Sequence, residues 1–262
     1  MADKDLLSER RGQSLILTFN RPEKGNAMTF DMANQLFTTL KNTTTDRGTR
    51  AVLLCGAGSN FMDGIDMSFL SGDVAAAQEN IIQLLLPYHS AIREIQAMEK
   101  PVIAAVEGKV SAAGLSLMLS CDFVIAAKNA VFNCKYTHSG TTPDGGCSYF
   151  LPRKIGIQKA VEFMMLCEDF DVAEAERLRL VNRVVDTDQL QTEALKWLDK
   201  LAEGPTRAYG AIKRLAMKAF EQDMNTHLGL EHTFFGHSMR SFDFRDAMKA
   251  RASGKPVRFS GT

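Results

Sequence analysis

The chain has 262 residues, which is enough to bury a sizeable core as one large domain or two of average size. Lysine plus arginine and aspartate plus glutamate both number 31, so the formal net charge is zero, which argues against nucleic acid or an anionic membrane as a partner. Five cysteines without a Cys-x-x-Cys pair argue against a disulfide framework, and no His/Asp/Glu cluster suggests a metal site. We find no signal peptide or bilayer-spanning run and expect a cytoplasmic protein.

Short apolar strands alternate with helical patterns along the first part of the chain. In the segment 81–98, Ile81, Leu84 and Tyr88 recur at three- and four-residue steps, so one face of this helix is apolar. The alternation indicates an α/β fold with crossover connections. In chain order we predict a strand at 15–20, a helix at 29–42, strands at 51–55 and 102–106, a helix at 115–120 and a strand at 122–127.

The strand pattern stops at about residue 188, and helical stretches follow, broken at Gly204-Pro205 and near Gly236. A helical extension of this kind has little core of its own and needs a surface to pack on. We therefore predict a core at 1–195 and a C-terminal helical region at 196–262.

One carboxylate stands on a Gly/Pro-rich turn after an apolar strand, Asp144 in Gly140-Thr-Thr-Pro-Asp-Gly-Gly146. Turns of this kind are where functional side chains concentrate. The alternative is an ordinary turn aspartate that precedes two glycines.

Several blocks in a fixed order resemble the crotonase, or enoyl-CoA hydratase/isomerase, superfamily. The resemblance implies a spiral core of ββα units, with C-terminal helices that build a homotrimer or a dimer of trimers. It covers nearly the whole chain, through the segments 15–28, 51–66, 100–122, 132–156 and 173–185 and the tail 241–259.

The resemblance also implies a coenzyme A thioester as substrate, with no permanently bound cofactor and no metal. The adenosine part would lie near 24–27, a basic residue of the C-terminal region would lie near the phosphates, and Leu84 and Phe69 would help to line an apolar acyl pocket. Arg21 and Lys24 could equally be solvated surface charges, and we expect Asp66 to cap the turn 67–70. The predicted substrate-binding residues are Arg21, Lys24, Asn26, Ala27, Gly64, Ile65, Asp66, Met67, Leu70, Leu85, Gly114 and Lys255.

In this superfamily two backbone N–H groups bind the thioester carbonyl and stabilise the enolate. By alignment of the blocks these donors are the amides of Asp63 and Ala113, and Ala113 opens a helix, where N–H groups lack intrahelical acceptors. The small residues around it could alternatively serve helix packing alone. The Asp63 side chain departs from the small residue usual in the family, and it could cap a turn or lie near the thioester.

The hydratases of the family use two glutamates, which by alignment fall here on Ser116 and Tyr136. Asp144 remains, and one carboxylate suffices for isomerisation because the same base can remove and return a proton. We therefore favour an acyl-CoA isomerase over an atypical hydratase.

Two alternatives stay open. In the first, which is similar to 4-chlorobenzoyl-CoA dehalogenase, Asp144 is a nucleophile oriented by Tyr136, and His89 activates water. In the second, the chain is a catalytically weak acyl-CoA-binding scaffold.

Overall fold

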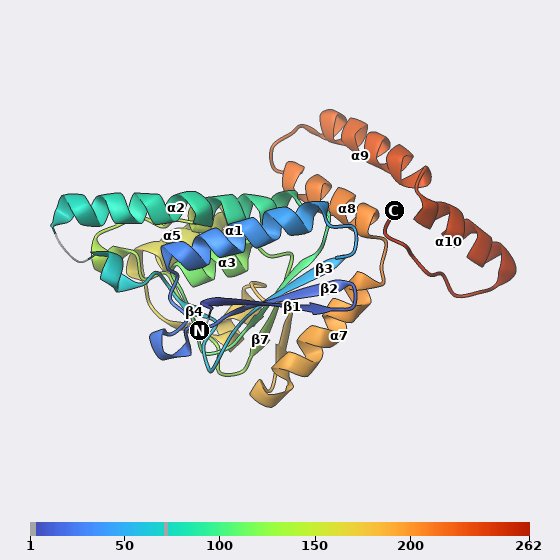
Figure 1. The fold of residues 1–262 in the computed structure, drawn as a ribbon. Helices are drawn as coiled ribbons and strands as arrows, with labels where there is room; N and C mark the ends of the chain where they lie inside the picture. Colours follow the sequence, from blue (N-terminus) through green and yellow to red (C-terminus); the bar gives the residue numbers. More distant parts are fainter. Residues whose placement is uncertain (1–3, 71–72) are drawn as a thin grey trace.

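A computed structural model describes residues 4–70 and 73–262 and shows a mainly parallel sheet with helices on both faces (Figure 1). The six-stranded sheet has the order β1-β2-β3-β5-β7-β10, and only the β1–β2 pair is antiparallel. Its central strands read as continuous apolar runs, as expected for parallel strands covered on both faces. The strands are Leu6–Arg11 (β1), Ser14–Phe19 (β2), Ala51–Gly56 (β3), Val102–Val106 (β5), Phe123–Ala127 (β7) and Arg183–Val185 (β10).

A second sheet of four short strands, in the order β4-β6-β8-β9, lies beyond the ends of the first. Each of β4, β6 and β8 follows a strand of the large sheet and leads into the next helix, so a ββα unit repeats along the chain. This repetition confirms the predicted crotonase-type α/β spiral. The strands are Met62–Asp63 (β4), Lys109–Ser111 (β6), Val131–Asn133 (β8) and Phe170–Asp171 (β9).

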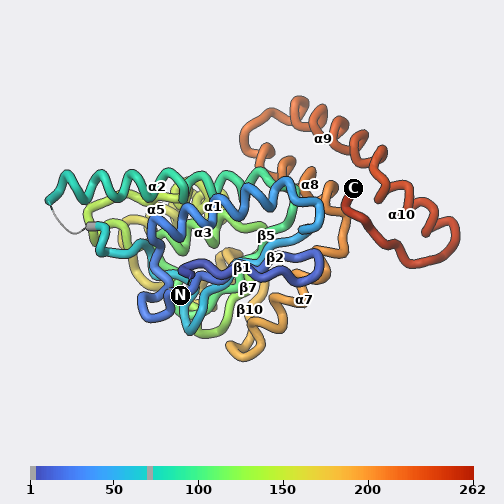
Figure 2. Tube along the Cα trace, in the orientation of Figure 1, coloured from blue at the N-terminus to red at the C-terminus, as the bar shows by residue number. Residues whose placement is uncertain are grey.

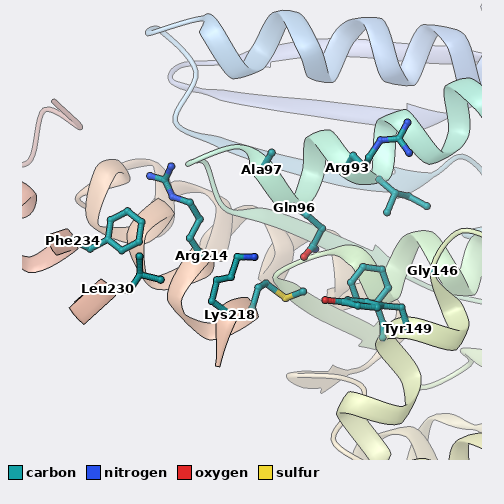
Figure 3. A pocket seen from close by; sticks show the side chains of 12 residues that line it. Arg93, Gln96, Ala97, Gly146, Tyr149, Arg214, Lys218, Leu230 and Phe234 are labelled. Atoms are coloured by element: carbon teal, nitrogen blue, oxygen red, sulfur yellow. The ribbon is translucent and has the colours of Figure 1, made fainter. Parts of the chain in front are cut away.

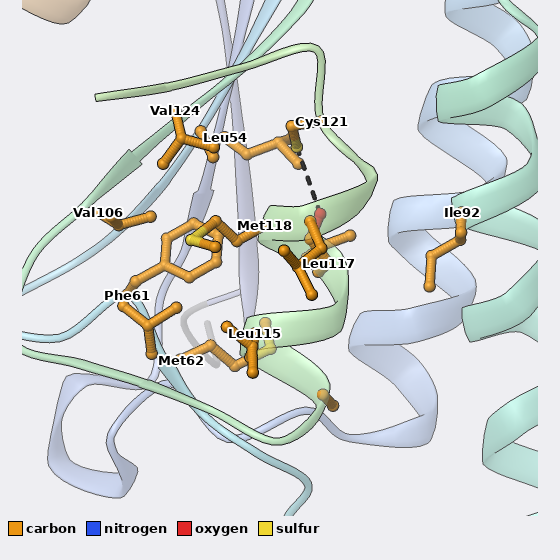
Figure 4. Close-up of a cluster of buried hydrophobic side chains, with 14 of the residues drawn as sticks. Leu54, Phe61, Met62, Ile92, Val106, Leu115, Leu117, Met118, Cys121 and Val124 are labelled. Atoms are coloured by element: carbon orange, nitrogen blue, oxygen red, sulfur yellow. Dashed lines mark hydrogen bonds between the residues drawn. The ribbon is translucent and has the colours of Figure 1, made fainter. Parts of the chain in front are cut away.

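Alternating side chains of the large sheet build two separate cores, because successive residues of a strand face opposite sides. Leu54, Val106 and Val124 contribute to the larger core around α3, where Phe61 and Met118 also lie (Figure 4). Ile16, Leu53 and Ile103 face α7 on the other side. The helices of the core are Phe30–Thr45 (α1), Val74–Ala97 (α2), Ala113–Ser120 (α3), Cys147–Ile155 (α4), Ile157–Leu166 (α5), Val172–Arg177 (α6) and Leu190–Ala202 (α7).

Helix α2 begins seven residues before the predicted helix, because Asp73 caps it by accepting a hydrogen bond from the Ala76 N–H at 2.8 Å. Short 3-10 turns lie at Pro22–Lys24 (η1), Met67–Leu70 (η2), Thr137–Ser139 (η3) and Thr187–Gln189 (η4). Two of them, η2 and η3, line the cavity described below as the candidate site.

The predicted boundary between residues 195 and 196 falls inside α7, and this helix belongs to the core because Leu190, Ala194 and Leu198 pack on the sheet. The three helices that follow are Thr206–Lys218 (α8), Met224–Met239 (α9) and Phe242–Ser253 (α10). Helices α9 and α10 extend away from both sheets (Figures 1 and 2). In the described part of the chain, no helix is long and apolar enough to cross a membrane.

Candidate active site

A cavity of about 670 Å³ opens between the second sheet, the N-terminal half of α2 and the segment 135–144. Its walls combine apolar side chains with a few polar groups, as is usual for small-molecule sites. Nine predicted site residues line it together: Asp63, Gly64, Ile65, Met67, Leu85, His89, Ala113, Tyr136 and Asp144.

Asp144 stands on the turn before α4, with one carboxylate oxygen held and the other open. Its Oδ1 accepts a hydrogen bond from the Tyr136 hydroxyl at 2.8 Å, whereas Oδ2 has no hydrogen-bond partner among the described residues. Burial raises the pKa of Asp144, and the Tyr136 hydrogen bond and nearby His89 offset this rise only in part. The carboxyl therefore holds a proton more readily than an exposed aspartate does.

The turn is fixed by Gly145, whose φ of 56° lies in the left-handed region. A Cβ atom there would come within 2.7 Å of the Tyr88 ring and 2.8 Å of Ser116 Cβ. Gly145 also donates its N–H to Nε2 of His89 at 3.2 Å. The turn thus packs directly against α2 and α3.

A backbone donor lies in the wall of the same cavity, at the start of α3. The Ala113 N–H is the first of the helix and has no acceptor among the described residues. Ala112, which precedes it, has a φ of 46°, a conformation that costs a non-glycine residue about 1–3 kcal/mol and is typical of functional sites. The Tyr88 hydroxyl fixes this turn by donating to the Ala113 carbonyl at 2.5 Å.

The second predicted donor, the Asp63 N–H, is already engaged, because it donates to the Gly25 carbonyl at 2.9 Å. The backbone N–H of Ile65 was not predicted as a donor from the sequence. At its bridge to Met28, the ladder bonds are made by the Gly64 carbonyl and the Asp66 N–H, both at 2.9 Å, so the Ile65 N–H faces the other way. This N–H has no acceptor in residues 4–70 or 73–262.

The carboxylate of Asp63 is neutralised by two lysines, Lys109 at 2.9 Å and Lys135 at 3.3 Å. Burial alone would raise its pKa, but the two lysines outweigh burial and the net pKa is lowered. Asp63 therefore stays ionised and paired.

Three of the predicted substrate-binding side chains instead fasten the loop that carries them. Arg21 contacts Asp66 at 2.7 Å and the Ala27 carbonyl at 2.9 Å. Asn26 is fully buried, and its amide donates to the Ala57 and Asn60 carbonyls at 2.9 and 2.7 Å. The predicted cap is confirmed, because Asp66 also accepts the Ser68 N–H at 3.0 Å.

Other predicted residues lie away from the cavity. Leu84 is fully buried in the core, and Gly114 is small because a Cβ would come within 2.3 Å of the Met62 carbonyl oxygen. Lys24 is exposed, and so is Lys255, which follows α10 in the chain. Helix α10 lies at the opposite end of the molecule from the start of α2 (Figure 1). The Leu70 side chain lies outside the described residues.

A second cavity of about 470 Å³ lies on the other side of the turn, between α2, α4, α8 and α9 (Figure 3). Gly146 and Tyr149 line it on one side and Met217 and Phe234 on the other, and none of its lining residues is acidic. No group of three or more His, Cys, Asp or Glu side chains in the described ranges is arranged to hold a metal ion. The cavity with Asp144 is therefore the candidate for acid–base chemistry.

Comparison with known proteins decides the family. A family model described as enoyl-CoA hydratase/isomerase matches residues 10–261. The chain belongs to this family. It is 31% identical to the 1,2-epoxyphenylacetyl-CoA isomerase of Escherichia coli, over 98% of each chain, and 32% identical to a probable enoyl-CoA hydratase of Rhodobacter capsulatus, over 94% of each.

Solved structures of the family have the same fold. An enoyl-CoA hydratase from Polaromonas superposes with a TM-score of 0.92 at 31% identity, covering 97% of this chain and 99% of that one. The family acts on acyl-CoA thioesters, and most of its similar relatives are named hydratases, whereas one is named an isomerase. The site itself must therefore indicate which reaction the chain performs.

Proposed function

We propose that the protein is an acyl-CoA isomerase in which Asp144 acts as the single acid–base residue. The observation that carries this proposal is the contrast between the two carboxylates of the cavity. Asp63 is paired with two lysines, whereas Asp144 keeps one oxygen without a partner among the described residues. One available carboxylate matches a reaction in which the same group removes and returns a proton.

The thioester carbonyl would bind between the N–H groups of Ile65 and Ala113, which stabilise the negative oxygen of the enolate. Loss of one such donor typically costs ~10²–10³ in rate. Oδ2 of Asp144 would take the proton from one carbon of the acyl group and return it to another. The raised pKa of Asp144 supports this step, since a base works best when its pKa approaches the working pH.

The substrate would be a coenzyme A thioester with an apolar acyl group, which Ile65, Met67 and Leu85 would contact. Arg21 is held internally by Asp66, so we assign the phosphates to exposed lysines, with Lys24 as the candidate on this chain. Helices α9 and α10 bury almost none of their residues within one chain, which supports their predicted role in a homotrimer or dimer of trimers. We retain the cytoplasm as the expected location.

The hydrolase alternative needs His89 to activate water, but the Nε2 atom of His89 accepts the Gly145 N–H at 3.2 Å. This contact supports a role for His89 in orienting the turn. Hydration is favoured by the names of several relatives, but it needs two acid–base groups. The isomerase in Escherichia coli is a relative of comparable similarity, so the comparisons are compatible with either reaction.

The proposal is tested by incubating the protein with 3-enoyl-CoA, 2-enoyl-CoA and aryl-CoA esters in deuterated water and following the products by mass. A product of conserved composition that carries deuterium, and that is lost in Asp144→Asn, is the expected result. Addition of water would indicate a hydratase, and loss of a ring substituent would indicate the dehalogenase-like route. Binding of the esters without any turnover would overturn the enzyme assignment in favour of a scaffold.

A further inference from the structure

Ser116, which is fully buried on α3, lies where the two halves of the site meet. Its Oγ is 3.0 Å from the Tyr136 hydroxyl, 2.9 Å from the Asp144 carbonyl and 3.2 Å from the Ala112 carbonyl. The Ala112 carbonyl belongs to the same peptide group as the Ala113 N–H. One hydroxyl therefore touches the residue that orients the base, the backbone of the base and the peptide that carries the proposed oxyanion donor.

The number of available hydrogens limits how these groups can pair. An ionised Asp144 only accepts, so the single hydrogen of Tyr136 points to its Oδ1. Ser116 also has one hydrogen and several acceptors within reach, Tyr88 among them. The Ala112 carbonyl already receives the Ser116 N–H, and the Asp144 carbonyl already receives the Cys147 N–H, both at 3.0 Å. The Tyr136 oxygen receives no other hydrogen in the described part of the chain.

We propose that Ser116 is a positioning residue that donates its hydroxyl hydrogen to Tyr136 and thereby strengthens the hydrogen bond from Tyr136 to Asp144. Hydrogen bonds arranged in a chain polarise one another, so the far donor stabilises the final acceptor more strongly. The inference rests on the proposed function, because it concerns the residue assigned as the base.

Packing supports the assignment of a small hydroxyl residue at this position. A Cβ on Gly145 would already lie 2.8 Å from Ser116 Cβ, so α3 and the turn approach each other closely here. A larger residue at 116 would push the turn that carries Asp144 away from α3. Alanine would fit the space but would leave the Tyr136 oxygen without its donor.

Ser116 also hydrogen-bonds Tyr88, so the comparison with and without the Tyr136 hydroxyl is needed to isolate its effect through Tyr136. Several other ionisable groups lie near the carboxyl of Asp144. Tyr88 and His89 interact with it from α2, and Cys134 and Tyr136 from the segment after β8. Lys135 and His138 line the same cavity.

The test is a ¹³C NMR titration of the Asp144 carboxyl in the intact protein, with its signal assigned by its loss in Asp144→Asn. We expect Tyr136→Phe to lower the acid dissociation constant of Asp144 about tenfold, because a hydrogen bond to the carboxylate is lost. Ser116→Ala should lower this constant by about twofold. In the Tyr136→Phe background, Ser116→Ala should add nothing.

Ser120→Ala is the matched control, because Ser120 is another fully buried hydroxyl of α3 and donates to the Leu117 carbonyl at 2.7 Å. It should leave the Asp144 titration unchanged. The inference is overturned if Ser116→Ala has no effect on the titration, or if its effect is the same with and without the Tyr136 hydroxyl. Because the readout is independent of turnover, failure of the proposed reaction would not alter this result.

Discussion

Two walls of one cavity each carry an aspartate, and their surroundings give the two carboxylates opposite properties. On the β4 wall, Lys109 and Lys135 pair with Asp63 and lower its pKa. On the turn before α4, burial raises the pKa of Asp144, and one of its oxygens has no partner in the described ranges. The comparison teaches that lining a cavity does not by itself set the pKa of a carboxylate; the balance between burial and the charges beside it does.

Displacing the turn that carries Asp144 should have the largest effect on activity. In Gly145→Ala the new Cβ meets Tyr88 and Ser116, so Asp144 moves relative to the Ala113 N–H. We expect kcat to fall by about 10²-fold, since a small misplacement of a catalytic group has costs of that order. Gly140→Ala is the control, because Gly140 has a φ of 66° but a Cβ added to it would meet no atom within 4 Å; a similar loss in this variant would contradict the account.

Removing the two lysines that pair with Asp63 should leave it a partly buried carboxylate without their charges, and so more like Asp144. In a Lys109→Met/Lys135→Met variant, Asp63 keeps a burial penalty without its partners, and we expect kcat to fall about tenfold because an unpaired carboxylate opposes the enolate charge. Adding Asp63→Asn should restore most of the activity. Steady-state kinetics of the double and triple variants would measure this, and no recovery in the triple variant would mean that the lysines act in another way.

His89 should contribute through the hydrogen bond that it accepts from Gly145. His89→Gln retains a side-chain acceptor and should keep kcat within a few-fold of the parent. His89→Ala should lower kcat by about two- to tenfold, which corresponds to one ordinary hydrogen bond. A loss of about 10³-fold or more in both variants would instead support water activation by the imidazole.

The smallest expected effect is on stability, and it has opposite signs for the two aspartates. The raised pKa of Asp144 means that its ionised form destabilises the fold as the pH rises through that pKa, so Asp144→Asn should raise the Tm at neutral pH. The lowered pKa of Asp63 stabilises the fold above the ordinary aspartate pKa, so Asp63→Asn should lower the Tm. Both differences in Tm should fade in acid. Calorimetry from about pH 3 to 8 would measure them, and Tm shifts of the same sign in the two variants would contradict the account.

Much of the fold was predictable from sequence, because strands such as Val102–Val106 are continuous apolar runs and helix faces repeat at three- and four-residue steps. The start of α2 was missed, since its first residues after the Asp73 cap have no apolar periodicity. The extent of the core was also underestimated, because α7 packs on the sheet through contacts that are distant in sequence.

Within the site, the turn that carries Asp144 could be predicted from sequence, but the hydrogen-bond partners of the backbone groups could not. The Asp63 N–H donates to the Gly25 carbonyl, and this pairing depends on where the loop after η1 lies in space. Ile65 has no polar side chain that would mark it as a donor. The internal ion pair of Arg21 with Asp66 likewise joins residues far apart in the chain.

The most direct test of the central claim is exchange of the α-hydrogen of a saturated acyl-CoA with deuterated water, followed by mass for the parent, Asp144→Asn and Asp63→Asn. This exchange needs only enolisation, so it does not depend on the identity of the physiological acyl group. We predict exchange in the parent and in Asp63→Asn, and a loss of about 10²–10⁴-fold in Asp144→Asn. Exchange that survives in Asp144→Asn and is lost in Asp63→Asn would contradict the account.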